Sequence, residues 1–112
     1  MTDIVLPFPP ATLSGHNNGH WRSKSTVVAK FRSWAKSATL AAQPVVPIDG
    51  DIRAVVTFYP PNNRGDRVNY PNRMKPLWDG IADALKVNDR RFLPTFHYAE
   101  PVKDARVVVV LS

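Results

Sequence analysis

The chain has 112 residues, 44% of them hydrophobic, and its 15 Lys and Arg against nine Asp and Glu give a net charge of +6. This is the length of one ordinary domain, so we expect a single domain over residues 1–112 and exclude two full domains. The absence of cysteine excludes a disulfide framework, a thiolate zinc site and a cysteine nucleophile. The longest unbroken apolar run is 107–111, whereas a membrane-spanning helix needs about 20 residues. We therefore expect a cytoplasmic protein with no membrane partner.

The first half of the chain predicts a strand, a helix and a second strand. Residues 4–8 predict a short strand that stops at two prolines, which cannot donate ladder hydrogen bonds. From Ser25 onward apolar side chains recur every three or four residues, which predicts a helix that ends before Pro44. Residues 52–59 are rich in β-branched and aromatic side chains and predict a strand, followed by a charged loop over 62–69.

The second half predicts a helix and two strands. An apolar stripe from Met74 to Leu85 predicts the helix, and Pro76 favours a start near Lys75 because proline is tolerated in the first turn. Residues 92–100 and 106–111 predict the strands. The resulting order β, α, β, α, β, β is typical of a small α+β domain with a mixed sheet and both helices on one face.

Acidic and basic residues follow two of these elements. Asp66 lies in the loop after the second strand, Asp89 lies after the second helix, and Lys75 and Asp79 lie on the polar face of that helix. Carboxylates bind Mg²⁺ because a hard cation prefers oxygen ligands, and a neighbouring lysine can hold a phosphate. The alternative is that these aspartates are solvated or cap helices.

The positive charge of the chain indicates a possible nucleic-acid partner. Residues 22–36 contain five Lys and Arg and no acidic residue. Basic clusters of this kind neutralise phosphates. The alternative is a charge that only keeps the domain soluble.

Several segments in a particular order point to a known family. They are Leu6-Pro7-Phe8-Pro9-Pro10, His20-Trp21-Arg22, Phe58-Tyr59-Pro60-Pro61, Asp66-Arg67-Val68-Asn69, Lys75, Asp79-Gly80-Ile81-Ala82-Asp83-Ala84-Leu85 and Asn88-Asp89. Together they resemble the RusA family of Holliday junction resolvases, which are commonly encoded by phages and prophages. The resemblance runs over nearly the whole chain.

This resemblance implies a crossover junction endodeoxyribonuclease that acts as a homodimer in DNA recombination and repair. It would resolve four-way junctions by paired symmetric nicks, with Mg²⁺ as cofactor, replaceable by Mn²⁺, and with no organic cofactor. The resemblance implies catalytic roles for Asp66, Lys75 and Asp89, and metal binding by the two aspartates. The residues expected to bind branched DNA are Arg22, Lys24, Arg64, Arg67, Arg73, Arg90 and Arg91.

Two positions depart from the family motif. Val68 stands where a second motif aspartate belongs, and Asn88 stands where an aspartate is usual. Valine cannot bind a cation, so one expected carboxylate is missing, and Asn69, Asp79 and Asn88 are the candidates to replace it. We expect positions 66 and 68 to project to one side of an extended segment. One alternative is that the protein is catalytically weakened and binds branched DNA without efficient cleavage. A further alternative is a small structural α+β protein.

Overall fold

The computed structural model describes residues 2–13 and 21–112, with residues 21–24 described by their backbone alone. Its strands and helices are β1 (Asp3–Pro7), α1 (Trp21–Ala42), β2 (Ile52–Tyr59), α2 (Lys75–Leu85), β3 (Phe92–Tyr98) and β4 (Arg106–Leu111). Short 3₁₀ segments lie between them: η1 (Ala11–Leu13), η2 (Arg67–Asn69), η3 (Pro71–Met74) and η4 (Asp89–Arg91). No helix within the described ranges is long and apolar enough to cross a membrane.

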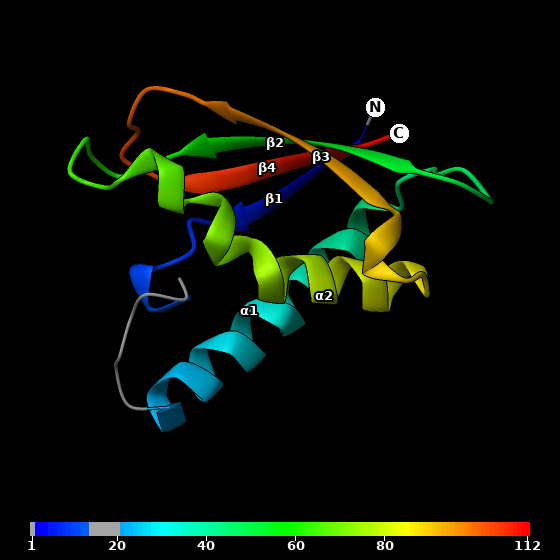
Figure 1. Cartoon of the computed structure of the whole chain (residues 1–112), viewed down its shortest axis with the longest axis horizontal. Helices are drawn as coiled ribbons and strands as arrows, with labels where there is room; N and C mark the ends of the chain where they lie inside the picture. The colour runs from blue at the N-terminus through cyan, green and yellow to red at the C-terminus, as the bar shows by residue number, and fades with distance from the viewer. Residues whose placement is uncertain (1, 14–20) are drawn as a thin grey trace.

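The described strands form one mixed sheet in the order β1-β4-β2-β3. β4 pairs antiparallel with β1 and with β2, whereas β2 and β3 are parallel. Parallel neighbours cannot be joined by a tight turn, so the chain crosses from β2 to β3 through α2. Both helices cover the same face of the sheet (Figure 1). The predicted small α+β domain and its element order are therefore confirmed.

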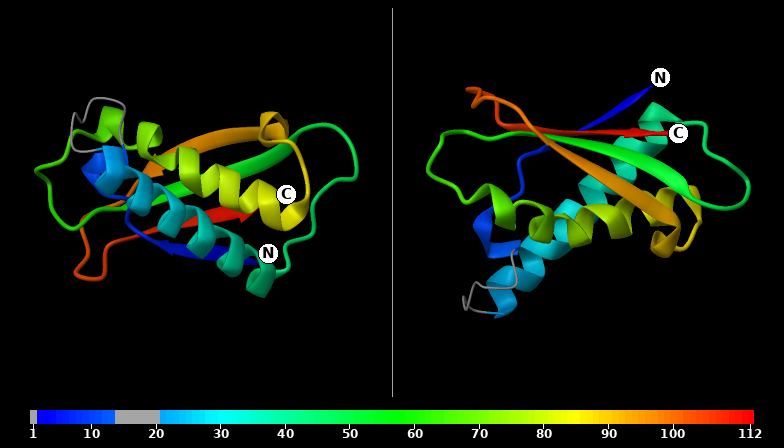
Figure 2. Two further views of the ribbon diagram at one scale, coloured as in Figure 1. Left: turned by 90° about the horizontal axis from the view of Figure 1, so that it is seen from below. Right: turned by 45° about the horizontal axis from the view of Figure 1, so that its top comes forward.

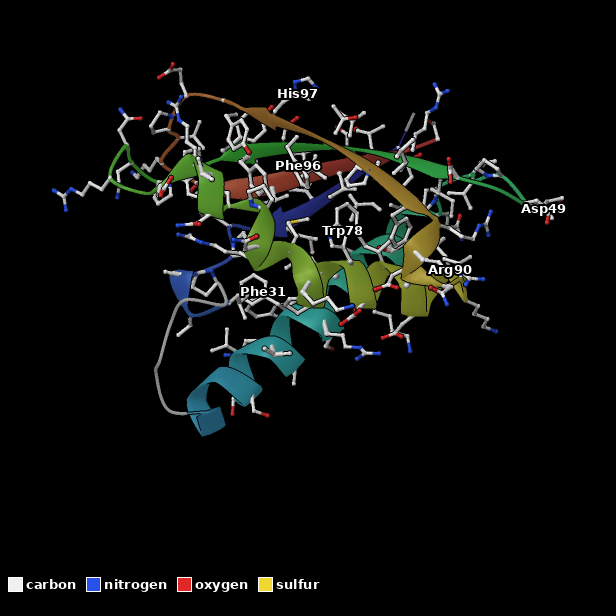
Figure 3. All side chains as sticks on the ribbon, viewed as in Figure 1. Phe31, Asp49, Trp78, Arg90, Phe96 and His97 are labelled. Atoms are coloured by element: carbon white, nitrogen blue, oxygen red, sulfur yellow. The ribbon has the colours of Figure 1, made fainter. Side chains whose placement is uncertain are left out.

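The core lies between the sheet and the two helices. Alternate side chains along the central strands are buried there: Ile52, Ala54, Val56 and Phe58 of β2, and Val107, Val109 and Leu111 of β4. In β3, Phe96 points toward the helices and is half-buried, whereas His97 points away from them and is exposed (Figure 3). The period of two in these strands is thus the direct consequence of having one covered face.

The two helices lie side by side under the sheet (Figure 2) and touch closely at Gly80. A Cβ at this position would meet the backbone carbonyl of Arg32 and would lie 2.7 Å from the Cβ of Ala35. Glycine is therefore what allows the two backbones to approach. Outside this contact, Arg32 donates two hydrogen bonds to the Asp83 carboxylate, at 2.7 and 3.0 Å.

Strand ends differ from the predictions because each strand needs a partner. β3 ends at Tyr98, whose parallel partner is Phe58, near the end of β2. β1 covers residues 3–7 rather than 4–8, because Pro7 is the residue paired with Arg106, where β4 begins. Residues 8, 99 and 100 were included in the predicted strands, but they lie beyond the last residues that pair with a neighbouring strand.

The starts of the two helices show one difference and one agreement. α1 begins at Trp21, before the predicted start at Ser25, so the helix extends beyond its apolar stripe. α2 begins at Lys75 as predicted, with Pro76 in its first turn, where no backbone donor is needed. The predicted charged loop over 62–69 also contains a helical segment, η2.

Candidate functional site

Lys75 brings two carboxylates together on the surface of the domain. Its Nζ donates to Asp79 Oδ1 at 3.0 Å, one helical turn further along α2. The same Nζ donates to Asp89 Oδ2 at 2.8 Å, which belongs to η4 beyond the end of the helix. Two of the predicted catalytic residues, Lys75 and Asp89, are thus in direct contact, and we call these three residues the Lys75 cluster.

The charges of the Lys75 cluster stabilise one another. The hydrogen bond to Asp89, followed by that to Asp79, raises the pKa of Lys75. The hydrogen bond from Lys75 lowers the pKa of Asp89. The Lys75 side chain is 68% exposed, so water screens these pairs and an anionic ligand can reach the ammonium.

Asp66 is held by its own loop. One carboxylate oxygen accepts from the backbone N–H of Val68 at 3.0 Å, and the other accepts from Asn69 Nδ2 at 3.3 Å. Asp66 is thereby the N-cap of η2. This is the helix-capping role that the sequence left open for a loop aspartate.

The extended segment predicted for residues 66–68 is wrong. Residues 67–69 form a 3₁₀ helix, which places residues at about three per turn instead of on alternating sides. The capping bond from Asp66 explains the turn, because it satisfies the N–H of Val68. Val68 is 80% exposed. Because the segment is not extended, side chains 66 and 68 are not aligned on one side, and the geometry gives no reason for them to share a ligand.

The Lys75 cluster offers two carboxylates to a cation. Among residues 2–13 and 21–112, no group of three or more His, Asp or Glu side chains is placed to hold a metal ion. Mg²⁺ is commonly held by one or two carboxylates together with waters and substrate phosphates. Asp79 and Asp89 are two such carboxylates, and in this structure both accept a hydrogen bond from the Lys75 ammonium.

The two asparagines suggested as substitute ligands have other roles. Asn88 Oδ1 accepts from the backbone N–H of Arg90 at 3.0 Å and caps η4. Asn69 donates through Nδ2 to Asp66. Of the three candidates for the missing carboxylate, Asp79 is the one that the fold brings to Lys75 and Asp89.

The predicted DNA-binding arginines lie in different surroundings. Arg64, Arg67 and Arg90 are exposed, and Figure 3 shows Arg90 on η4. Arg91 instead donates to the carbonyl oxygens of Gly50 at 2.8 Å and Pro47 at 2.7 Å, so it ties η4 to the loop before β2. The side chains of Arg22 and Lys24 lie outside the described residues.

The sequence spacing of Lys75 and Asp79 was a signal that these two side chains meet, although an aspartate on a polar helix face is usually only solvated. Lys75 and Asp79 are spaced i, i+4, which places them together on a helix. The meeting with Asp89 depends on the turn after α2, where Lys86 adopts a left-handed conformation with φ of 57°. Spacing alone does not predict where such a turn directs the chain.

Comparison with known proteins shows a relative but no assigned activity. The chain is 34% identical over 114 aligned positions to an uncharacterized protein of Xylella fastidiosa, strain Temecula1, covering 98% of this chain and 74% of that protein. The chain belongs to the same family as that protein. No family model matches the chain.

Proposed function

We propose that this protein is a metal-dependent endonuclease of the RusA type that resolves branched DNA. The observation that carries the proposal is the contact between Lys75 and Asp89, which are 14 residues apart in sequence. The resemblance assigned catalytic roles to this lysine and this aspartate on the basis of the sequence alone. The net charge of +6 supports a polyanionic substrate.

In this proposal Asp89 and Asp79 hold a Mg²⁺ or Mn²⁺ ion, in place of the pair Asp66 and Asp89 that the resemblance implies. The ion supplies Lewis acidity toward an oxygen of the scissile phosphate. Lys75 leaves its carboxylate partners and donates to the phosphate, where its positive charge stabilises the charge that develops during cleavage. Arg64, Arg67 and Arg90 orient the strand by contacting phosphates.

The homodimer belongs to the same proposal. Paired nicks on opposite strands require two sites related by a two-fold axis, which is the commonest symmetry of small oligomers. Sedimentation of the protein should give twice the mass of one chain. A strict monomer at micromolar concentration, with and without DNA, would remove the basis for symmetric resolution.

The alternative function is binding of branched DNA with weak cleavage. It is favoured by the exposed, apolar Val68 and by the position of Asp66, whose hydrogen bonds lie within its own loop. With five phosphate contacts per subunit, a plot of log affinity against log salt concentration would have a slope of about −4 to −5. A flat salt response would exclude DNA binding by this surface.

A gel assay on a synthetic four-way junction, with and without Mg²⁺, tests the proposed activity. Replacing Asp89 by asparagine should lower cleavage by at least about 100-fold, because a metal ligand and the lysine's partner are lost together. Asp3→Asn is the matched control, since it removes one negative charge from an exposed position of β1, on the sheet face that the helices leave uncovered. Cleavage that survives Asp89→Asn, or is absent in the unmodified protein, would exclude this catalytic assignment.

A further inference from the structure

Arg73, two residues before Lys75 in the chain, is held against two aromatic rings. Its guanidinium carbon lies 5.0 Å from the ring centre of Tyr70 and 5.8 Å from that of Phe8. Its Nη1 donates to the carbonyl oxygen of Pro9 at 3.1 Å. These contacts join η3 to the proline-rich segment after β1 and fix the position of the guanidinium.

The positive charge of Arg73 has no carboxylate partner in the described part of the chain. Its Nε is buried and has no hydrogen-bond partner. Burial lowers the pKa of Arg73. A partly desolvated cation without an anion is unfavourable, and an anion bound beside it would offset that cost. Arg32 differs in both respects, because its side chain is exposed and its charge is paired with Asp83.

A hollow of about 470 Å³ opens beside this guanidinium, a volume within the range of small-molecule sites. Its walls combine the rings of phenylalanine, tyrosine and proline residues with polar atoms of the loop before Asp66. They include Arg73, Phe8, Pro10, Pro61, Asn62 and Gly65. A Cβ on Gly65 would lie 2.5 Å from the Tyr70 hydroxyl, so glycine is needed for the loop to pass here. Because Gly65 directly precedes Asp66, the hollow adjoins the loop that Asp66 caps.

We propose that this hollow binds a phosphate group of a DNA strand, with Arg73 as the cation that recognises it. The identification of the strand as DNA rests on the proposed function, whereas the need for an anion rests on Arg73 itself. A nucleotide matches both parts of the hollow, because its phosphate meets the guanidinium and its sugar and base meet proline rings. An acidic peptide would match the charge as well, and it is therefore included in the test.

The test titrates the full-length protein, without metal, with the 5′-phosphorylated dinucleotide of thymidine and separately with inorganic phosphate. The Nε–H resonance of Arg73 in a ¹⁵N NMR spectrum reports binding in the unmodified protein. Both probes should shift this resonance, and the dinucleotide should bind more tightly than phosphate. An unshifted Arg73 resonance, or tighter binding of a short Pro-Glu peptide than of the dinucleotide, would overturn the proposal.

Arg73→Gln should weaken dinucleotide binding by tenfold or more, on the order of one lost charge-assisted contact. It should also make the salt slope of junction binding shallower by about 0.9 per subunit. Arg53→Gln is the matched control with the same loss of charge, because Arg53 is exposed on the sheet face that the helices leave uncovered and does not line the hollow. Equal losses in the two variants would overturn the site.

The two proposals fail separately. Dinucleotide binding at Arg73 in a protein that does not bind junctions would retain this pocket and exclude the proposed function. Junction cleavage with an unchanged salt slope in Arg73→Gln would retain the function and exclude the pocket.

Discussion

The Lys75 cluster and the Asp66 loop place acidic residues on the surface by different means. Asp89 is held by a lysine from another element, 14 residues away. Both hydrogen-bond partners of Asp66 lie within three residues of it. The position of Asp89 relative to Lys75 therefore depends on how α2 and η4 pack, whereas the conformation around Asp66 is mainly local. Variants that disturb packing should therefore affect one and spare the other.

The largest effect is expected for Gly80→Ala. The added methyl would meet the backbone of α1 at Arg32, and overpacking of this kind costs about 3 kcal/mol of unfolding free energy. Urea unfolding measures this loss. If the comparison holds, NMR shifts should change at Asp89 and remain unchanged at Asp66.

A second substitution sharpens the test of the helix contact. Ala35→Gly removes the side chain that lies 2.7 Å from the added methyl. The double variant should therefore lose less stability than the sum of the single variants. Strict additivity would show that the helices separate at Gly80 instead of crowding Ala35.

The next effect is the loss of the cap in Asp66→Ala. Removing an N-cap side chain costs about 1 kcal/mol, and the loss should be measurable by urea unfolding. Asp66→Asn is the control, since asparagine caps as well as aspartate and should stay close to the parent. Equal losses in both variants would indicate a role for the charge of Asp66 beyond capping.

The pH dependence of the Lys75 cluster should be smaller, because its side chains are exposed. The pKa of Asp89 lies below its ordinary value of 3.8, so the stabilising contribution is full above that value and is lost as pH falls through the folded-state pKa. For Lys75 the contribution is full below 10.5 and is lost as pH rises through its raised pKa. In Lys75→Met, NMR titration should show Asp89 protonating at a higher pH. An unchanged titration would mean that the pair does not form in solution.

The smallest effect is expected for Val68→Asp. Val68 is 80% exposed, so stability should change by less than about 0.5 kcal/mol. Because η2 removes the strand-like alignment with Asp66, Mg²⁺-dependent junction cleavage should not increase. A large increase would show that the loop straightens when DNA and metal bind.

Much of the framework followed from local pattern. β2 and β4 have the predicted bounds, since runs of β-branched and aromatic residues favour strands. α2 begins at Lys75 because a helix tolerates proline in its first turn, and this start places Pro76 there. These features depend on residues near one another along the chain.

The site was predictable only in part. Lys75 and Asp89 were identified through the resemblance, but not the hydrogen bond between them. The cap made by Asp66 was left open, because a side chain two residues from an N–H can either bond it or remain solvated. Asp79 was expected on the polar face of a helix, but that position does not predict that Asp89 of η4 shares Lys75 with it.

The sequence by itself determined the element order, the bounds of β2 and β4 and the position where α2 starts, because side-chain propensity and proline geometry act locally. Tertiary structure alone decided that Asp89 returns to Lys75, that Gly80 sets the distance between the helices, and that Arg73 lies against the rings of Tyr70 and Phe8. The physical reason is that packing and charge pairing join residues far apart in the chain, and their separation in space is set by the whole core.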